Sequence, residues 1–375
     1  MNRWKPKRYA WVLMLLLVCV LGSACGASDD DDSDTFDVDD DVNNDDDDTN
    51  DDTIGDDDDT IGDDDIDDDD NDDDDNDDND DDDNDDNDDN DDNDDNDNDD
   101  DTAPPACEQY ASPQIFGRLG AEDLTETSGF AVSLKNPGVL WAQNDSGDGP
   151  YLYAMDLEGN YLGRVELDGA TAVDWEDMAV GPCDEDECLY AGDIGDNGAS
   201  RTDCLVYRVV EPDVDPLVPF GNMLLATWEA FPFTYPDGPR DAEALAVHPD
   251  GDVYVFSKYP FGTSEMYVFP SLAADDPVEL VHLGDLDSGG GIATVTGGDI
   301  HRNGRRLLLR TYLTAIEWRL PLGEQFDDIA LVGERDVVPT GLELQGESIA
   351  FVPTDGNYVH ASEGRHTIIY RIPCR

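Results

Sequence analysis

Acidic side chains recur at one place in a repeated signature along the second half of the chain. An acid, a small residue and an apolar run follow one another in five segments: ETSGFAV from Glu126, DWEDMAVGP from Asp174, DAEALAVHPDG from Asp241, GGDIHRNG from Gly297 and GESIAFVPTDG from Gly346. Alignment of these segments puts in one column Glu126, Glu176, Glu243, Asp299 and Glu347. Converging carboxylates repel one another, and burial raises their pKa, so such a column favours a bound cation. Because every ligand would be an oxygen, the pattern predicts Ca²⁺ or Mg²⁺ rather than Zn²⁺.

The same column also admits a structural interpretation. Each acid could accept hydrogen bonds from backbone N–H groups of the neighbouring repeat, and the compensating positive charge could come from Lys258, Arg240 or Arg310. Both interpretations stay open on the sequence alone.

A second set of polar residues follows the next predicted strand of each repeat. Those strands end at Asn144, Asp193, Ser257, Thr311 and Ser362, and one step further lie Asp145, Ile194, Lys258, Tyr312 and Glu363. Asp145, Asp193 and Asp196 fall in the Gly-rich loops NDSGDG and GDIGDN, whose extra oxygens favour a metal or a polar ligand. The expected ligand or channel residues are Glu126, Asp145, Asp193, Asp196, Lys258, Arg310 and Glu363.

The elements that would position these residues are short β-strands. From residue 106 onward, β-branched and aromatic runs alternate with Asp-Gly, Asn-Gly and Pro turns, and no apolar period of 3.6 residues persists. Five copies of a four-stranded antiparallel unit predict an all-β fold, a single β-propeller of five blades, with six blades as the alternative. In a propeller the first strand of each blade lines the channel, and it begins at the mouth where the second strand ends.

The ends of the domain predict how the ring closes. The last repeat has only three strands, while QIFGRLG at 114–120 is a lone strand before the first repeat, so the N-terminal strand is expected to complete the last blade. Cys107 and Cys374 would then meet across the seam in a disulfide worth about 4–5 kcal/mol in the chain-entropy model. Cys183 and Cys188 flank a turn and could form a hairpin bridge, leaving Cys204 free or paired with one of them.

The first 105 residues contain a predicted export signal and a predicted spacer. A basic start, an apolar run and small residues before Cys25 predict a signal peptide over 1–24. The segment LGSAC resembles the bacterial lipobox, which implies a lipid on Cys25 at the start of 25–28; cleavage by an ordinary signal peptidase after Ala24 is the alternative. Residues 29–105 are an Asp/Asn-rich tract that we expect to be a disordered spacer, with weak divalent binding as a side effect. An exported protein, lipid-anchored in the outer membrane or at the cell surface of a bacterium, is the predicted setting.

The charge of the chain excludes nucleic acid as a partner. Of 94 acidic residues, 48 lie in 29–101, which leaves 46 against 16 basic residues in 102–375. The predicted domain over 106–375 is therefore strongly acidic without the spacer, whereas binding to a phosphate backbone needs clustered Lys and Arg. Metal ions or cationic partners are favoured, although a solvated acidic surface without a partner explains the charge equally well.

Motifs for catalysis are scarce. GESIA at 346–350 superficially matches a nucleophile elbow, but that motif needs a strand, a sharp turn and a helix, and here it lies in a β repeat. The five histidines show no metal-binding spacing.

Several repeat motifs are shared with known propellers. The signatures ESIAF and DWEDMAV, followed by LYAGDIGDN and VYRVVEP, resemble exported bacterial β-propellers of mostly unassigned role over 112–375. They are more distantly similar to propellers named for phytase-like esterase activity and to quorum-regulated surface propellers with calcium in the channel. The resemblance implies that Glu126, Glu176, Glu243 and Glu347 are channel residues, whereas Asp299 departs from the pattern.

Two functions follow as expectations. The first is a surface-displayed lipoprotein propeller, without catalysis, that binds an unknown ligand or protein at an acidic, calcium-containing mouth. The second is a metal-dependent hydrolase of phosphate or carboxylic esters. We expect a monomer whose contact with the membrane is through its N-terminal lipid.

Overall fold

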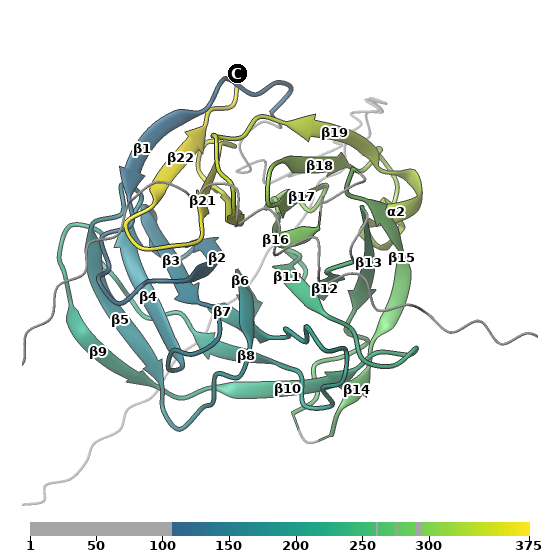
Figure 1. Cartoon of the computed structure of the whole chain (residues 1–375), viewed down its shortest axis with the longest axis horizontal. Helices are drawn as coiled ribbons and strands as arrows, with labels where there is room; N and C mark the ends of the chain where they lie inside the picture. Colours follow the sequence, from purple (N-terminus) through teal and green to yellow (C-terminus); the bar gives the residue numbers. More distant parts are fainter. Residues whose placement is uncertain (1–106, 260–261, 275, 290–293) are drawn as a thin grey trace, which may run out of the picture. The chain divides into compact units, whose positions relative to one another are not determined.

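The computed structural model describes residues 107–375 apart from 260–261, 275 and 290–293. The expected signal peptide, the lipid-bearing Cys25 and the spacer lie outside the described residues. Five sheets stand as blades around a central axis (Figure 1), so the all-β propeller of five blades is confirmed and the alternative of six blades is wrong. Helical structure in the described part is a short 3-10 turn, η1 (Phe326–Asp328), and α2 (Ile329–Val332). No helix among the described residues has the length and apolar character needed to cross a membrane.

Blades 1 and 2 each gain a strand at their outer edge. Blade 1 contains β2 (Thr127–Val132), β3 (Val139–Asn144), β4 (Tyr151–Asp156) and β5 (Tyr161–Leu167) in antiparallel order, with β9 (Gly221–Ala226) parallel to β5. Blade 2 contains β6 (Trp175–Cys183), β7 (Asp186–Asp193), β8 (Leu205–Val210) and β10 (Glu229–Thr234), with β14 (Val278–Glu279) parallel to β10. In each case the connection between the third and fourth strands of the next blade covers an edge that would otherwise present unpaired backbone groups.

Blades 3 and 4 have the expected four strands. Blade 3 contains β11 (Ala242–Val247), β12 (Val253–Ser257), β13 (Thr263–Val268) and β15 (Val281–Asp287). Blade 4 contains β16 (Val295–Ile300), β17 (Arg306–Thr311), β18 (Ala315–Arg319) and β19 (Glu334–Val338).

Blade 5 joins the two ends of the domain. It contains β20 (Gly346–Phe351), β21 (Tyr358–Ser362) and β22 (Ile368–Ile372), completed by β1 (Gln114–Arg118) antiparallel to β22. The predicted bridge between Cys107 and Cys374 is present, with Cα atoms 5.3 Å apart. The hairpin bridge between Cys183 and Cys188 is present as well, and Cys204 is free and buried. These findings confirm the predicted closure.

Small residues let the five inner strands pack closely around the axis. A Cβ on Gly129 of β2 would lie 2.6 Å from the backbone nitrogen of Met178 on β6, too close for a real side chain. Apolar side chains from the flanking strands fill the spaces between blades; Trp141, Tyr153 and Tyr190 are fully buried. The core therefore consists of interblade clusters rather than one central mass.

Candidate functional site

The starts of the inner strands meet the ends of the second strands at one mouth of the channel, as expected. The backbone N–H of Asp145 donates to the carbonyl of Glu126 at 2.9 Å. In blades 2 and 3, Gly195 donates to Asp174 at 3.1 Å and Lys258 donates to Asp241 at 2.8 Å. Blade 5 has the same bond from Glu363 to Gln345, so this backbone contact fixes Asp145, Lys258 and Glu363 at equivalent places, while in blade 2 the donor lies one residue further along.

Each inner strand carries a β-bulge near this mouth. In blade 2, Trp175 pairs with Asp193 and Asp177 pairs with Gly192, so Glu176 is the extra residue. A bulge turns the side chain of its extra residue out of the regular alternation. The pairing gives Glu243, Thr296 and Glu347 as the extra residues of blades 3, 4 and 5. In blade 1, Ser128 and Gly129 both lie between the paired residues, and Ser128 directly follows the first pair, as Glu176 does in blade 2.

This register corrects two members of the expected acidic column. Glu126 precedes the bulge of blade 1 by two residues and is exposed at the rim. Burial, followed by the charge of Glu126, raises the pKa of Glu363. Asp299 follows the bulge of blade 4 by three residues and lies toward the other end of the channel. The ring of five acids was therefore wrong: Glu176, Glu243 and Glu347 share the bulge position, while blades 1 and 4 place hydroxyl side chains there.

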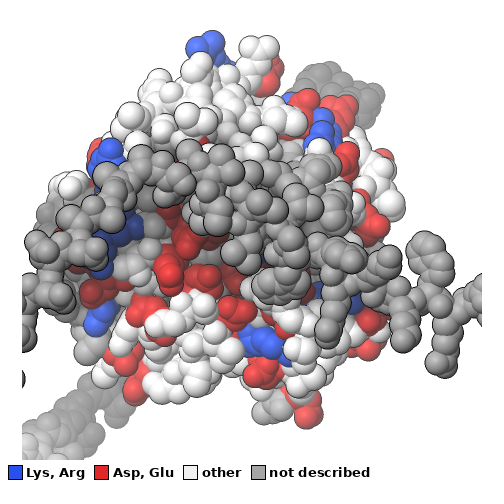
Figure 2. Space-filling model, viewed as in Figure 1, with Lys and Arg blue, Asp and Glu red and all other residues white. Residues whose placement is uncertain are grey.

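Two acids that the column missed join the mouth. Asp174 and Asp241 lie two residues before Glu176 and Glu243, at the place that Glu126 occupies in blade 1. The repeated Asp-x-Glu pattern in DWE and DAE could have indicated these two acids from the sequence. The resulting mouth cluster contains Glu126, Asp145, Asp174, Glu176, Asp241, Glu243, Lys258, Glu347 and Glu363. Figure 2 shows Asp and Glu side chains gathered at the centre of the face in view.

Lys258 provides one positive charge within this acidic group. Its ammonium donates a hydrogen bond to Glu243 and lies 5.7 Å from the ring centre of Tyr312. Burial lowers the pKa of Lys258, but Glu243, Tyr312 and Glu176 outweigh burial and raise it, so the ammonium stays charged. A single lysine cannot neutralise all of the surrounding carboxylates.

Burial and mutual repulsion raise the pKa values of the mouth acids. Burial raises the pKa of Glu243 to about 8 although Lys258 opposes the shift. Burial, together with Glu363 and Glu243, raises the pKa of Glu347 to about 9. The pKa of Glu176 rises well above its usual range through burial and then through Glu243 and Asp145. The cluster thus holds protons near neutral pH that a bound cation could replace.

Three of these carboxylates are spaced as metal ligands. Asp145, Asp174 and Glu176 each offer an oxygen, and these oxygens all lie within 4.8 Å of one another. Burial, followed by the charge of Asp145, raises the pKa of Asp174 to about 6. A donor set of oxygen atoms only, with excess negative charge, fits a hard divalent cation such as Ca²⁺.

The two other predicted loop acids use their oxygens to hold the backbone. Asp193 accepts hydrogen bonds from the N–H groups of Val173 and Asp174 at 3.0 and 3.1 Å, and Arg201 binds it at 2.7 Å. Asp196 accepts from the N–H groups of Ser200 and Arg201. Both carboxylates are buried, so they position the loop that carries the mouth rather than face a ligand.

Arg310 is a structural residue and not a channel residue. Its guanidinium is fully buried and pairs with Glu343 at 2.7 Å, and Glu343 also contacts His360 at 2.8 Å. Gly346 leaves the space that the guanidinium occupies. The sequence pattern predicted that Arg310 lies at the end of its strand. It did not predict that Gly346 of the next blade covers the guanidinium.

Asp177 and Asp299 perform the blade-joining role that the sequence allowed for the acid column. Asp177 is fully buried and accepts hydrogen bonds from the N–H groups of Met178, Leu245 and Gly298 at 2.8, 3.0 and 2.9 Å. It therefore ties blades 2, 3 and 4 together. Asp299 accepts from Ile300 at 2.8 Å and from Phe351 at 2.7 Å, which links blade 4 to blade 5.

Comparisons with known proteins find likeness of fold at low similarity. No family model matches this chain, and no curated protein matches it. The PQQ-bound aldose sugar dehydrogenase of Streptomyces coelicolor is 12% identical, over 72% of this chain and 99% of that one, with a TM-score of 0.41. The β-propeller domain of Cps50 (Swd1) from Myceliophteria thermophila is 11% identical, over 65% of this chain and 83% of that one, with a TM-score of 0.36. Neither likeness assigns a role to any residue of this chain.

Proposed function

We propose that this protein is a non-catalytic binding propeller held outside the cell, with a calcium ion at its acidic mouth through which it binds a ligand or partner. The observation that carries the proposal is the convergence of oxygens from Asp145, Asp174 and Glu176 within 4.8 Å. A ligand that offers carboxylate, carbonyl or hydroxyl oxygens could complete the coordination of the ion, since Ca²⁺ takes six to eight oxygens.

The charge of the mouth supports a cation there. The pKa values of Asp174 and Glu176 are raised by burial and then by neighbouring acids, so ionisation of both is unfavourable unless positive charge is added. The ammonium of Lys258 is already hydrogen-bonded to Glu243.

Sequence and disulfides support a place outside the cell. Two disulfides suit an oxidising compartment, since thiols in the cytosol are kept reduced. The lipobox-like LGSAC would give an anchor at Cys25, and the 73 residues of 29–101 would give a tether that reaches at most roughly 240 Å.

Calcium-dependent thermal unfolding of the full chain tests the proposal. A site formed only in the folded state stabilises it by about 2.7 kcal/mol at a calcium concentration of 100 times Kd. That corresponds to a rise of roughly 5–10 °C in the unfolding midpoint for a domain of this size. Any ions held by the spacer do not contribute unless they bind the folded and unfolded states differently. In Glu176→Gln, the rise should disappear, while the calcium-free midpoint should increase because folding no longer has to bury an ionisable carboxyl among other acids.

A matched control uses another cluster whose side chains are spaced as metal ligands. It contains Glu265, His282 and Asp285, which are half-exposed to exposed. Asp285→Asn should keep the full calcium response. An unchanged midpoint with calcium in the wild-type chain, or an equal loss in both variants, would contradict a mouth site. Calcium-dependent turnover of simple carboxylic or phosphate esters would instead support a metal-dependent hydrolase and contradict the non-catalytic role.

A further inference from the structure

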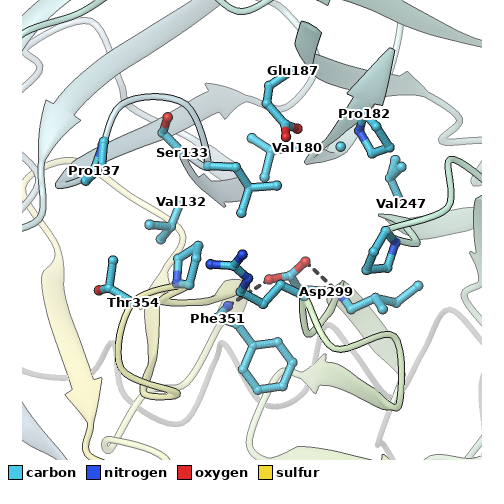
Figure 3. Close-up of a pocket in the computed structure, with 16 residues that line it drawn as sticks. Val132, Ser133, Pro137, Val180, Pro182, Glu187, Val247, Asp299, Phe351 and Thr354 are labelled. Atoms are coloured by element: carbon cyan, nitrogen blue, oxygen red, sulfur yellow. Dashed lines mark hydrogen bonds between the residues drawn. The ribbon is translucent and has the colours of Figure 1, made fainter. Parts of the chain in front are cut away.

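A pocket lies at the mouth of the channel opposite to the mouth cluster. It encloses about 330 Å³ and is lined by residues at the ends of the inner strands and in the turns that follow them (Figure 3). Val132, Val247, Ile300 and Phe351 are the last residues of β2, β11, β16 and β20. The volume is at the lower end of the range of about 300–1,000 Å³ that is typical of small-molecule sites. None of the mouth-cluster acids contributes to its wall.

Repeated apolar residues form most of this wall. Strand pairing places one residue from each blade at the same level, and these are Val132, Val180, Val247, Ile300 and Phe351. Two positions further along, blades 2, 3 and 5 contribute Pro182, Pro249 and Pro353. The repeat therefore builds an apolar collar on which an apolar side chain could pack.

Blade 4 departs from the repeat twice, and both departures line the pocket. Asp299 stands where the other blades have Ala131, Ala179, Ala246 and Ala350. Arg302 stands where three blades have proline, and it is exposed. Asp299 binds the backbone of blade 5, but no hydrogen bond or ion pair of Arg302 among the described residues joins it to a neighbouring blade.

Glu187 of β7 adds a second carboxylate. Figure 3 shows the carboxylates of Glu187 and Asp299 directed toward the pocket interior from opposite walls. Among the described residues, one oxygen of Glu187 (Oε2) is buried without a hydrogen-bond partner. Burial, followed by Glu211, raises the pKa of Glu187, and Arg302 opposes that shift. Asp299 uses each oxygen for one backbone bond, and each oxygen has a second lone pair for a ligand.

We propose that this pocket binds a free amino acid with an apolar side chain. The ammonium group would pair with the carboxylate of Glu187, whose Oε2 has no hydrogen-bond partner among the described residues, the carboxylate would meet the Arg302 guanidinium at the rim, and the side chain would pack on the apolar collar. The wall presents charges of both signs, so a ligand that carries both an ammonium and a carboxylate can pair with each of them. This site is independent of the calcium proposed at the other mouth.

Calorimetric titration of the full chain tests the proposal with leucine, valine, methionine and phenylalanine as probes. For leucine, two matched analogues isolate each charge: 3-methylbutylamine lacks the carboxylate and 4-methylpentanoate lacks the amine. We expect leucine-type amino acids to bind and each analogue to bind at least about tenfold more weakly, the value of one lost charged interaction of about 1.4 kcal/mol.

Variants assign the binding to this pocket. Arg302→Gln and Glu187→Gln change exposed or half-exposed side chains, and each should weaken leucine binding at least about tenfold while the thermal midpoint stays unchanged. Glu176→Gln, at the other mouth, should leave leucine affinity unaltered. The proposal is overturned if none of the four amino acids binds at millimolar concentration, if 4-methylpentanoate binds as tightly as leucine, or if both pocket variants keep wild-type affinity.

Discussion

Replacement of Asp177 by alanine should destabilise the propeller more than any surface change in the same blade. The side chain is fully buried and accepts three backbone N–H groups, two of them from blades 3 and 4. Each buried N–H left without an acceptor costs about 1–3 kcal/mol. Relief of the desolvation that raises the pKa of Asp177 offsets part of this cost. We therefore expect a net loss of about 3–5 kcal/mol in Asp177→Ala.

Asparagine at the same position separates the bonds from the charge. One carboxylate oxygen (Oδ2) accepts from both Leu245 and Gly298, so the single carbonyl oxygen of Asn can keep both interblade bonds. Asp177→Asn should lose the bond from Met178 and cost about 1–2 kcal/mol.

Urea unfolding of the full chain with disulfides intact measures these differences, and thermal unfolding should show a midpoint at least about 6 °C lower for Asp177→Ala. The control is Asp186→Ala, which changes an exposed acid on β7 and should stay within about 0.5 kcal/mol of the wild type. The interblade role of Asp177 is refuted if the alanine variant loses less than about 1 kcal/mol, or if Asn costs as much as Ala.

Two more predictions concern the disulfides and the mouth acids. Removal of Cys107–Cys374, whose partners are 267 residues apart, should cost about 3 kcal/mol more than removal of Cys183–Cys188, 5 residues apart, because loop entropy grows with loop length. Comparison of the two paired Cys→Ser variants in urea checks this, and equal costs would contradict the entropic account. Without calcium, stability should fall as pH rises from about 5 to about 9, because folding raises the pKa of Glu243 to about 8 and of Glu347 to about 9, so the folded state holds protons that the unfolded state releases. Glu347→Gln should flatten this dependence, and a wild-type midpoint that rises over the same range would contradict the assignment.

The blade architecture could be predicted from the sequence because each blade repeats its own alternation and turns. The same regularity gave the ends of the second strands correctly: Asn144, Asp193, Ser257, Thr311 and Ser362 pair with the first residues of β2, β6, β11, β16 and β20. The edge strands β9 and β14 were not predicted from the sequence. Each pairs with a strand of the preceding blade, and that blade already has its four expected strands.

The acid column failed for a local reason. A bulge adds one residue to an inner strand without adding one to its partner. An alignment of the repeats by residue type alone can therefore misplace a residue by two or three positions along the strand. If the repeats are aligned by the ends of their second strands, Asn144 and Thr311, then Ser128 and Thr296 share the column of Glu176. Glu126 and Asp299 do not. The burial of Arg310 beneath Gly346 depends on contact between two blades, which repeat alignment does not report.

The closing disulfide also determines how the domain would respond to mechanical force. Cys107 precedes β1 in the chain and is bonded to Cys374, two residues after the end of β22. A pull transmitted along the preceding chain reaches this covalent bond before it reaches the hydrogen bonds between β1 and β22. The strand that closes the ring would therefore be shielded from peeling, and the force would pass into the last blade as a whole.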